Sequence, residues 1–143
     1  MPQITRIFIK TALLYFVAAL LLGILLAARA WLPESLLLGG LWPVYWHLFM
    51  LGWVTQLIVG IAYWMFPKFS RAMPRGSDRL AWATWGLLNG GLLLRVVGEP
   101  ALAAASGDVA LNAARLVVAA SALLQWAGGM TFLANTWQRV KEK

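Results

Sequence analysis

The sequence contains no cysteine, a single histidine and only five acidic residues. Without cysteine the chain can form no disulfide, zinc–thiolate site or iron–sulfur cluster, and it cannot attach a c-type heme through thioether bonds. Charged residues make up 12% of the chain and hydrophobic residues 62%, whereas soluble domains carry about 25% charged residues. The composition therefore predicts an integral membrane protein.

The catalytic groups of the common hydrolases and transferases are also missing. Ser70, Ser106 and Ser121 have no histidine partner at a plausible depth, and the sequence has no phosphate-binding glycine loop. The net charge of +7 would favour a nucleic-acid partner in a soluble protein. Here the basic residues cluster at the ends of apolar segments, which is typical of membrane topology. We expect the lipid bilayer as a partner and no nucleic acid.

Four apolar segments are candidates for membrane helices, since a helix needs about 20 apolar residues to cross the hydrocarbon. The expected helices cover about residues 7–31, 42–67, 79–99 and 112–138 of one transmembrane domain, residues 1–143. Pro100 should end the third helix there at the latest, which leaves residues 99–112 as a loop with room for a short helical turn. The predicted fold class is all-α, an integral membrane four-helix bundle or arc.

Basic residues predict the orientation of these helices. One side of the four helices carries nine of them, which are Arg6, Lys10, Lys68, Arg71, Arg75, Arg79, Arg139, Lys141 and Lys143. The other side carries Arg29, Arg95 and Arg115. Because basic loops stay in the cytoplasm, both termini are expected on the cytoplasmic side.

Small and polar residues on the spans have two interpretations each. Glycines such as Gly52, Gly60 and Gly91 would let helix backbones approach closely, but a glycine also leaves room for a flat macrocycle. Polar side chains either join helices by hydrogen bonds or line a pore; these are Gln56, Asn89, Gln125 and Asn135. Tryptophans near the ends of the spans match an aromatic belt; these are Trp31, Trp42, Trp46, Trp64, Trp82 and Trp137.

His47 lies within the apolar segment, about five residues or roughly 7 Å from its outer end. An ionisable side chain at membrane depth is a functional-site hypothesis by default. Its neutral imidazole either ligates a metal or heme iron or forms a hydrogen bond between helices. Arg95 lies at comparable depth, and it either pairs with Glu99, snorkels to the interface, or binds a buried anion such as a heme propionate.

The residues around His47 match a known pattern. They read His47-Leu-Phe-Met-Leu-Gly-Trp-Val and are followed by Gly60, Tyr63, Trp64 and Pro67. This pattern resembles the histidine-bearing helix of heme–copper oxidase and nitric oxide reductase large subunits. Residues 89–100 are similar to a segment of short membrane proteins related to that superfamily.

The resemblance implies a b-type heme in the bacterial inner membrane, with His47 as the iron ligand. It makes Arg95, Tyr45, Gly52 and Trp53 the further cofactor-binding positions. The family's large subunit contains three groups of four helices around a pseudo-threefold axis. One chain would correspond to one group, and a homotrimer would rebuild the ring. A respiratory-chain redox partner is expected on the same ground.

The sequence also departs from the family. The family's His-x-His reads Tyr45-Trp46-His47 here, and no second histidine exists to complete a three-histidine copper centre or a bis-histidine heme within one chain. Whether copper binds, and whether the protein is an oxidoreductase-like enzyme, are left open. The expected role is electron transfer or binding of oxygen or nitric oxide. The alternatives are a cofactor-free structural or assembly subunit of a respiratory complex and, less favoured, a small channel.

Overall fold

The computed structural model describes residues 1–31, 36–70 and 74–140, which form helices and connections without a strand in those ranges. Arg71, Lys141 and Lys143, which entered the count of basic residues, lie outside them. Four helical stretches are long and apolar enough to cross a membrane: Gln3–Trp31, Leu38–Met65, Asp78–Ala104 and Asp108–Arg139. The predicted all-helical class, with four helices of membrane-spanning length, is confirmed.

The helical segments follow one another closely along the chain. They are α1 (Gln3–Ala27), η1 (Ala28–Trp31), α2 (Leu36–His47), η2 (Leu48–Thr55), α3 (Gln56–Met65), α4 (Asp78–Ala104), α5 (Asp108–Thr136) and η3 (Trp137–Arg139). The second long stretch therefore contains α2, the π-helix η2 and α3 in direct succession. The sequence indicated one uninterrupted helix there, so the π-helix is an addition that hydropathy did not reveal.

The prediction that the third helix ends at Pro100 is wrong. Helix α4 continues through Pro100 to Ala104, and the expected loop over residues 99–112 shrinks to residues 105–107. Proline removes one backbone donor but leaves the helix intact where a neighbouring helix packs on it. Here α2 lies directly against the backbone at this position, as the space around Gly40 shows: a Cβ there would lie 2.6 Å from the Pro100 Cα. Gly107 then turns the chain with a φ of +86° before α5 begins.

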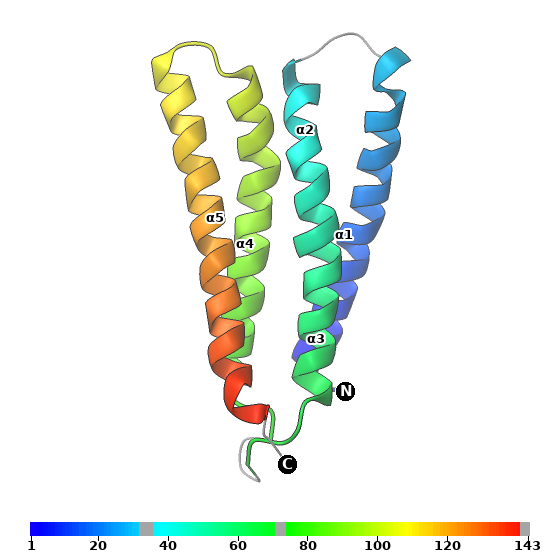
Figure 1. Ribbon diagram of the computed structural model, residues 1–143, viewed down its shortest axis with the longest axis vertical. Coiled ribbons are helices and arrows are strands. Elements are labelled where there is room, and N and C mark those ends of the chain that lie inside the picture. Colours follow the sequence, from blue (N-terminus) through cyan, green and yellow to red (C-terminus); the bar gives the residue numbers. More distant parts are fainter. Residues whose placement is uncertain (32–35, 71–73, 141–143) are drawn as a thin grey trace.

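The four long stretches lie side by side in a row, in the order α1, α2–α3, α4, α5 (Figure 1). Towards one end α1 also reaches α4, where the Trp85 indole donates to the Thr11 hydroxyl over 3.3 Å. Both termini and the α3–α4 loop lie at one end of the row, called the terminal end below, and η1 and the α4–α5 loop lie at the opposite, distal end. Large apolar side chains remain exposed on the two outer helices, for example Leu14 on α1 and Leu116 on α5.

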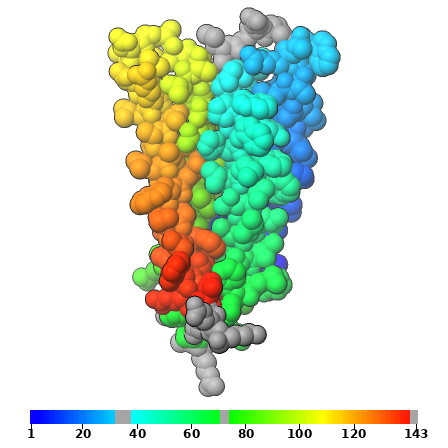
Figure 2. All heavy atoms as spheres, in the orientation of Figure 1, coloured from blue at the N-terminus to red at the C-terminus, as the bar shows by residue number. Residues whose placement is uncertain are grey.

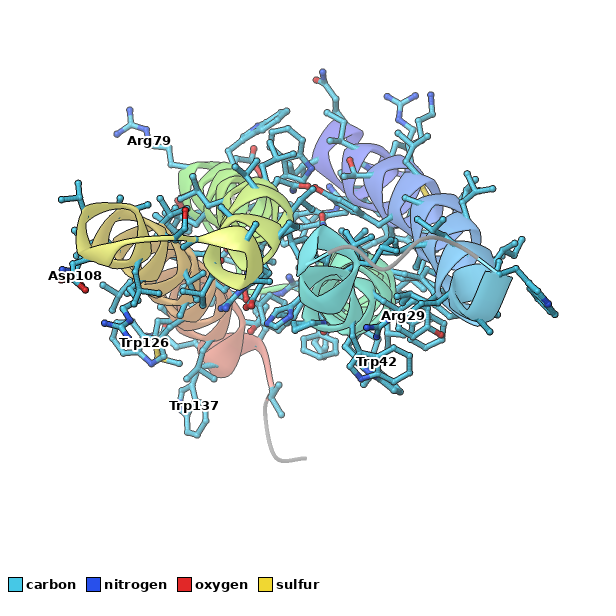
Figure 3. The ribbon with its side chains drawn as sticks, turned by 90° about the horizontal axis from the view of Figure 1, so that it is seen from above. Arg29, Trp42, Arg79, Asp108, Trp126 and Trp137 are labelled. Carbon is cyan, nitrogen blue, oxygen red and sulfur yellow. The ribbon has the colours of Figure 1, made fainter. Side chains whose placement is uncertain are left out.

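Exposed tryptophans project from the row at several levels. Trp42 of α2, Trp126 of α5 and Trp137 of η3 point away from the helices on the same side (Figure 3). Trp42 lies towards the distal end and Trp137 at the terminal end, where an aromatic belt would place them. Trp126 was not among the expected belt residues.

Glycine pairs hold the helices of the row together. The sequence contains three Gly–Gly pairs, at 39–40, 90–91 and 128–129. Gly40 has no room for a Cβ atom against the α4 backbone, nor has Gly91 against α5, and a Cβ at Gly128 would lie tightly, 3.0 Å from Leu88 of α4. The other glycine of each pair meets nothing closer than 3.8 Å. The close-packing interpretation is therefore confirmed for Gly91, and for Gly52 and Gly60, where a Cβ would lie 2.8 Å from side chains of α1.

Candidate functional site around His47

His47 is the last residue of α2, and a hydrogen bond fixes its ring. Its Nδ1 lies 2.8 Å from the carbonyl oxygen of Pro43, one turn earlier in the same helix. A carbonyl oxygen can only accept, so Nδ1 carries the proton and Nε2 presents a lone pair. The side chain is half-buried, and no hydrogen bond to Nε2 is found among the described residues. The imidazole is thus held in the tautomer that ligates metals through Nε2.

The π-helix η2 begins directly after His47 and determines which residues face α4. Gly40 and Gln56 both contact α4, although a continuous α-helix would turn residues sixteen positions apart to faces about 160° away from each other. A π-turn takes in roughly one more residue than an α-turn, so each residue advances by roughly 80° instead of 100°. Over the eight residues of η2 the missing rotation is roughly 160°, which brings Gln56 back to the side of Gly40.

His47 therefore belongs to the side of α2 that faces α4. It follows Gly40 by seven residues within one α-helix, a rotation of only about 20°. Two contacts bracket its level in the row: Gly40 lies against Glu99 and Pro100, and Gln56 bonds Asn89. Along the chain, His47 lies between Gly40 and Gln56. Arg95 likewise lies between Asn89 and Glu99. Both residues are thus in the distal half of the α2–α4 contact, although no direct contact joins them in the described structure. The expectation that His47 lies about five residues from the end of its helix is wrong, because α2 begins at Leu36, eleven residues before it.

Arg95 pairs with Glu99, as one of the interpretations of the sequence predicted. Its Nη1 donates to the Glu99 carboxylate over 2.7 Å, and both side chains are largely buried. The i to i+4 spacing brings the two groups together because α4 is helical through both positions. The Nε atom of Arg95 is also buried and has no hydrogen-bond partner within the described residues.

The other three residues of the expected cofactor site contact α1. The ring of Tyr45 lies over Gly23, at 3.2 Å from the place of a Cβ atom, and Gly52 lies against Tyr15 at 2.8 Å. Trp53 stacks on Phe16 with ring centroids 4.0 Å apart. These contacts are interhelical packing on the side of α2 and η2 that faces α1, so the structure does not gather Tyr45, Gly52 and Trp53 with His47 in one place. Their cofactor-binding role stays a prediction.

The polar residues of the spans form hydrogen bonds within and between helices. Gln56 of α3 and Asn89 of α4 exchange side-chain hydrogen bonds of 3.1 and 3.3 Å, and both are buried. Ser121 of α5 donates to the Gly91 carbonyl of α4 over 2.7 Å, and Gln125 donates to Ser121. The interhelical interpretation of Gln56 and Asn89 is confirmed, whereas Gln125 reaches only its own helix.

A buried arginine at the terminal end was not expected to be part of any site. Arg139 was counted as a basic residue of a cytoplasmic tail, yet it is fully buried. Its guanidinium donates to four backbone carbonyl oxygens, those of Tyr63, Phe66, Pro67 and Arg75, at 2.7–3.3 Å. Three of these carbonyls belong to the C-terminal end of α3 and the residues after it, where helix carbonyls lack intrahelical partners. Figure 2 shows the C-terminal end of α5 lying beside α3 here.

Further hydrogen bonds join the helices and the α3–α4 loop at the terminal end. The Tyr63 hydroxyl donates to the Asp78 carboxylate over 2.7 Å, which links the end of α3 to the start of α4. Asn135 of α5 accepts from the Ser77 backbone N–H and donates to the Ser77 carbonyl. No sequence pattern predicts this arrangement, because the partners of Arg139 and Asn135 are backbone atoms far away along the chain.

Comparisons with protein-family models, with curated proteins and with solved structures find no match to this chain. The likeness to heme–copper oxidase large subunits therefore rests on the residues of the sequence alone.

Proposed function

We propose that this chain is a membrane protein that binds a b-type heme through His47. The observation that carries the proposal is the Nδ1–H bond to the Pro43 carbonyl, which leaves Nε2 as an acceptor without a partner in the described structure. Histidines that ligate metals usually donate their other ring N–H to a backbone carbonyl or a carboxylate in this way. The bond fixes the tautomer and the ring orientation.

Further residues in the α2–α4 contact fit a bound heme. Arg95 is the charged residue level with His47, and its buried Nε is a donor that a carboxylate of the cofactor could use. The π-helix places His47 and Gln56 on the α4 side of one stretch, and π-turns often occur at functional sites. A bound heme would supply electron transfer if its sixth position is filled, or gas binding if that position is open.

The proposed setting is the bacterial inner membrane, with the terminal end in the cytoplasm. Six of the nine basic residues of that side lie in the described structure: Arg6, Lys10, Lys68, Arg75, Arg79 and Arg139. Their excess over the distal end supports the orientation. By the resemblance, a homotrimer of four-helix units is the proposed assembly, and its mass in detergent tests it.

The test is an absorption spectrum of the purified protein, oxidised and reduced with dithionite, together with a pyridine hemochrome assay. We expect a Soret band with about one b-type heme per chain in the wild type, and none in His47→Ala. Leu51→Ala is the matched control, because it shortens a half-buried side chain one turn further along and should keep the Soret band.

Added imidazole distinguishes iron ligation by His47 from a purely structural role of this residue. If His47 ligates iron, added imidazole should restore the Soret band of His47→Ala, because it replaces the missing ligand and not the missing packing. A wild-type protein without heme after expression in heme-replete cells refutes the proposal. So does a His47→Ala variant that binds heme as the wild type does.

A second function is favoured by the contacts of the family-like residues. Tyr45, Gly52 and Trp53 pack on α1, and Arg95 already has a carboxylate partner in Glu99. A cofactor-free structural or assembly subunit of a respiratory complex would use the same fold. This alternative predicts that His47→Gln is tolerated and that the protein co-purifies with such a complex without a Soret band.

A further inference from the structure

The α3–α4 loop at the terminal end contains a hollow of about 520 Å³ lined by Lys68, Ser70, Pro74 and Arg75. A volume of this size is in the range of small-ligand sites. The hollow is far from His47, which lies in the distal half of the row. It therefore belongs to neither the proposed heme site nor the α2–α4 contact.

Two of the described residues that line the hollow, Lys68 and Arg75, carry positive charge. Lys68 is exposed and Arg75 half-buried, and neither forms an ion pair within the described residues. The sequence has no aspartate or glutamate between Leu36 and Ser77. Two cations that line one hollow favour an anionic ligand. The first carboxylate after the loop, that of Asp78, accepts from the Tyr63 hydroxyl and does not line the hollow.

Hydrogen bonds hold the described residues of the loop on both sides of positions 71–73. Arg139 donates to the carbonyl of Pro67 over 3.0 Å and to that of Arg75 over 3.3 Å, so one buried guanidinium fixes both ends of the loop. Within the loop, the Phe69 N–H donates to the Pro74 carbonyl over 3.0 Å. A site that is ordered in advance loses less conformational entropy when a ligand binds.

The position of the hollow indicates the source of the anion. The hollow lies at the end of four helices that are long and apolar enough to cross a membrane, the level at which phospholipid headgroups lie. Basic pockets at the ends of membrane helices bind anionic headgroups. We propose that the hollow binds the phosphate of an anionic phospholipid headgroup, with Lys68 and Arg75 as its charged partners.

The experiment is native mass spectrometry of the full chain, released from detergent and titrated with phosphatidylglycerol, with phosphatidylcholine or with inorganic phosphate. The test variant is Lys68→Gln/Arg75→Gln. The control is Arg29→Gln/Arg115→Gln, which removes the same charge from exposed residues near the distal end. Far-UV circular dichroism verifies that both variants keep the helical content of the wild type.

We expect phosphatidylglycerol to bind more tightly than phosphatidylcholine, and the test variant to weaken that binding roughly 10- to 30-fold. The control variant should bind as the wild type does. Equal losses in the two variants would show general charge attraction and overturn the site, as would unchanged binding by the test variant. Phosphatidylcholine binding as tightly as phosphatidylglycerol overturns the charge argument. Inorganic phosphate binding as tightly as the lipid would reassign the hollow to free phosphate.

Discussion

Gly40→Ala should weaken the contact between α2 and α4, while Gly39→Ala should not. A Cβ atom at position 40 would lie 2.6 Å from the Glu99 carbonyl oxygen and from the Pro100 Cα, both of which are backbone atoms. Ordinary contact begins at 3.4 Å, so the two helices would have to separate by several tenths of an ångström. At position 39 no atom lies within 4 Å.

The two variants share the gain in helix stability and differ in the cost of overpacking. Alanine replaces glycine in a helix in both cases, which stabilises the helix by about 1 kcal/mol. Overpacking costs about 1–3 kcal/mol where the surroundings cannot move freely, and only Gly40→Ala carries that cost. The free energies of unfolding should therefore differ by about 1–3 kcal/mol, with Gly39→Ala the more stable variant.

Reversible unfolding by sodium dodecyl sulfate in mixed micelles measures this difference, with the fluorescence of the nine tryptophans as the signal. A difference below about 0.5 kcal/mol, the usual scatter of neutral surface substitutions, would refute the close approach of α2 to α4 at Gly40. Greater destabilisation by Gly39→Ala would refute the assignment of the two faces of α2.

Three further predictions use the same unfolding assay. Gln56→Leu should lower the free energy of unfolding by about 1–2 kcal/mol, because Asn89 loses its buried partner. A double-mutant cycle with Asn89→Leu should give a coupling energy of about 0.6–1.7 kcal/mol. Additive effects of the two substitutions would show that the side chains do not interact. Arg139→Gln should lower the free energy of unfolding by about 3 kcal/mol, because backbone carbonyls lose their charged donor. The exposed Arg115→Gln should change it by no more than about 0.5 kcal/mol, and similar losses in the two variants would contradict the burial of Arg139. Asn135→Ala should cost about 1–2 kcal/mol through its two bonds to the α3–α4 loop, and an unchanged midpoint would contradict those bonds.

Hydropathy and short-range spacing predicted the parts of this fold that depend on neighbours along the chain. The four long stretches follow from apolar length, and the Arg95–Glu99 pair follows from its i to i+4 spacing. For Gln56 and Asn89 the sequence left interhelical hydrogen bonds and pore lining open, and it did not identify the two as partners.

The remaining features depend on packing between helices, which the sequence does not encode locally. Pro100 marks the end of a helix in isolation, yet the contact with Gly40 lets α4 continue. Nothing in residues 48–55 marks a π-helix, because its advantage lies in turning Gln56 towards α4. Likewise, within Gly90–Gly91 the sequence cannot distinguish the packed glycine from the open one.

The burial of Arg139 has a consequence for the order in which the protein can fold during synthesis. The carbonyl oxygens of Tyr63, Phe66, Pro67 and Arg75 receive their donor from a residue 64 to 76 positions later in the chain. At 5–20 residues per second, Arg139 is synthesised about 3–13 s after Arg75. These four carbonyls therefore lack this donor until the end of α5 is made. The α3–α4 loop is among the last parts of the described structure to become fixed.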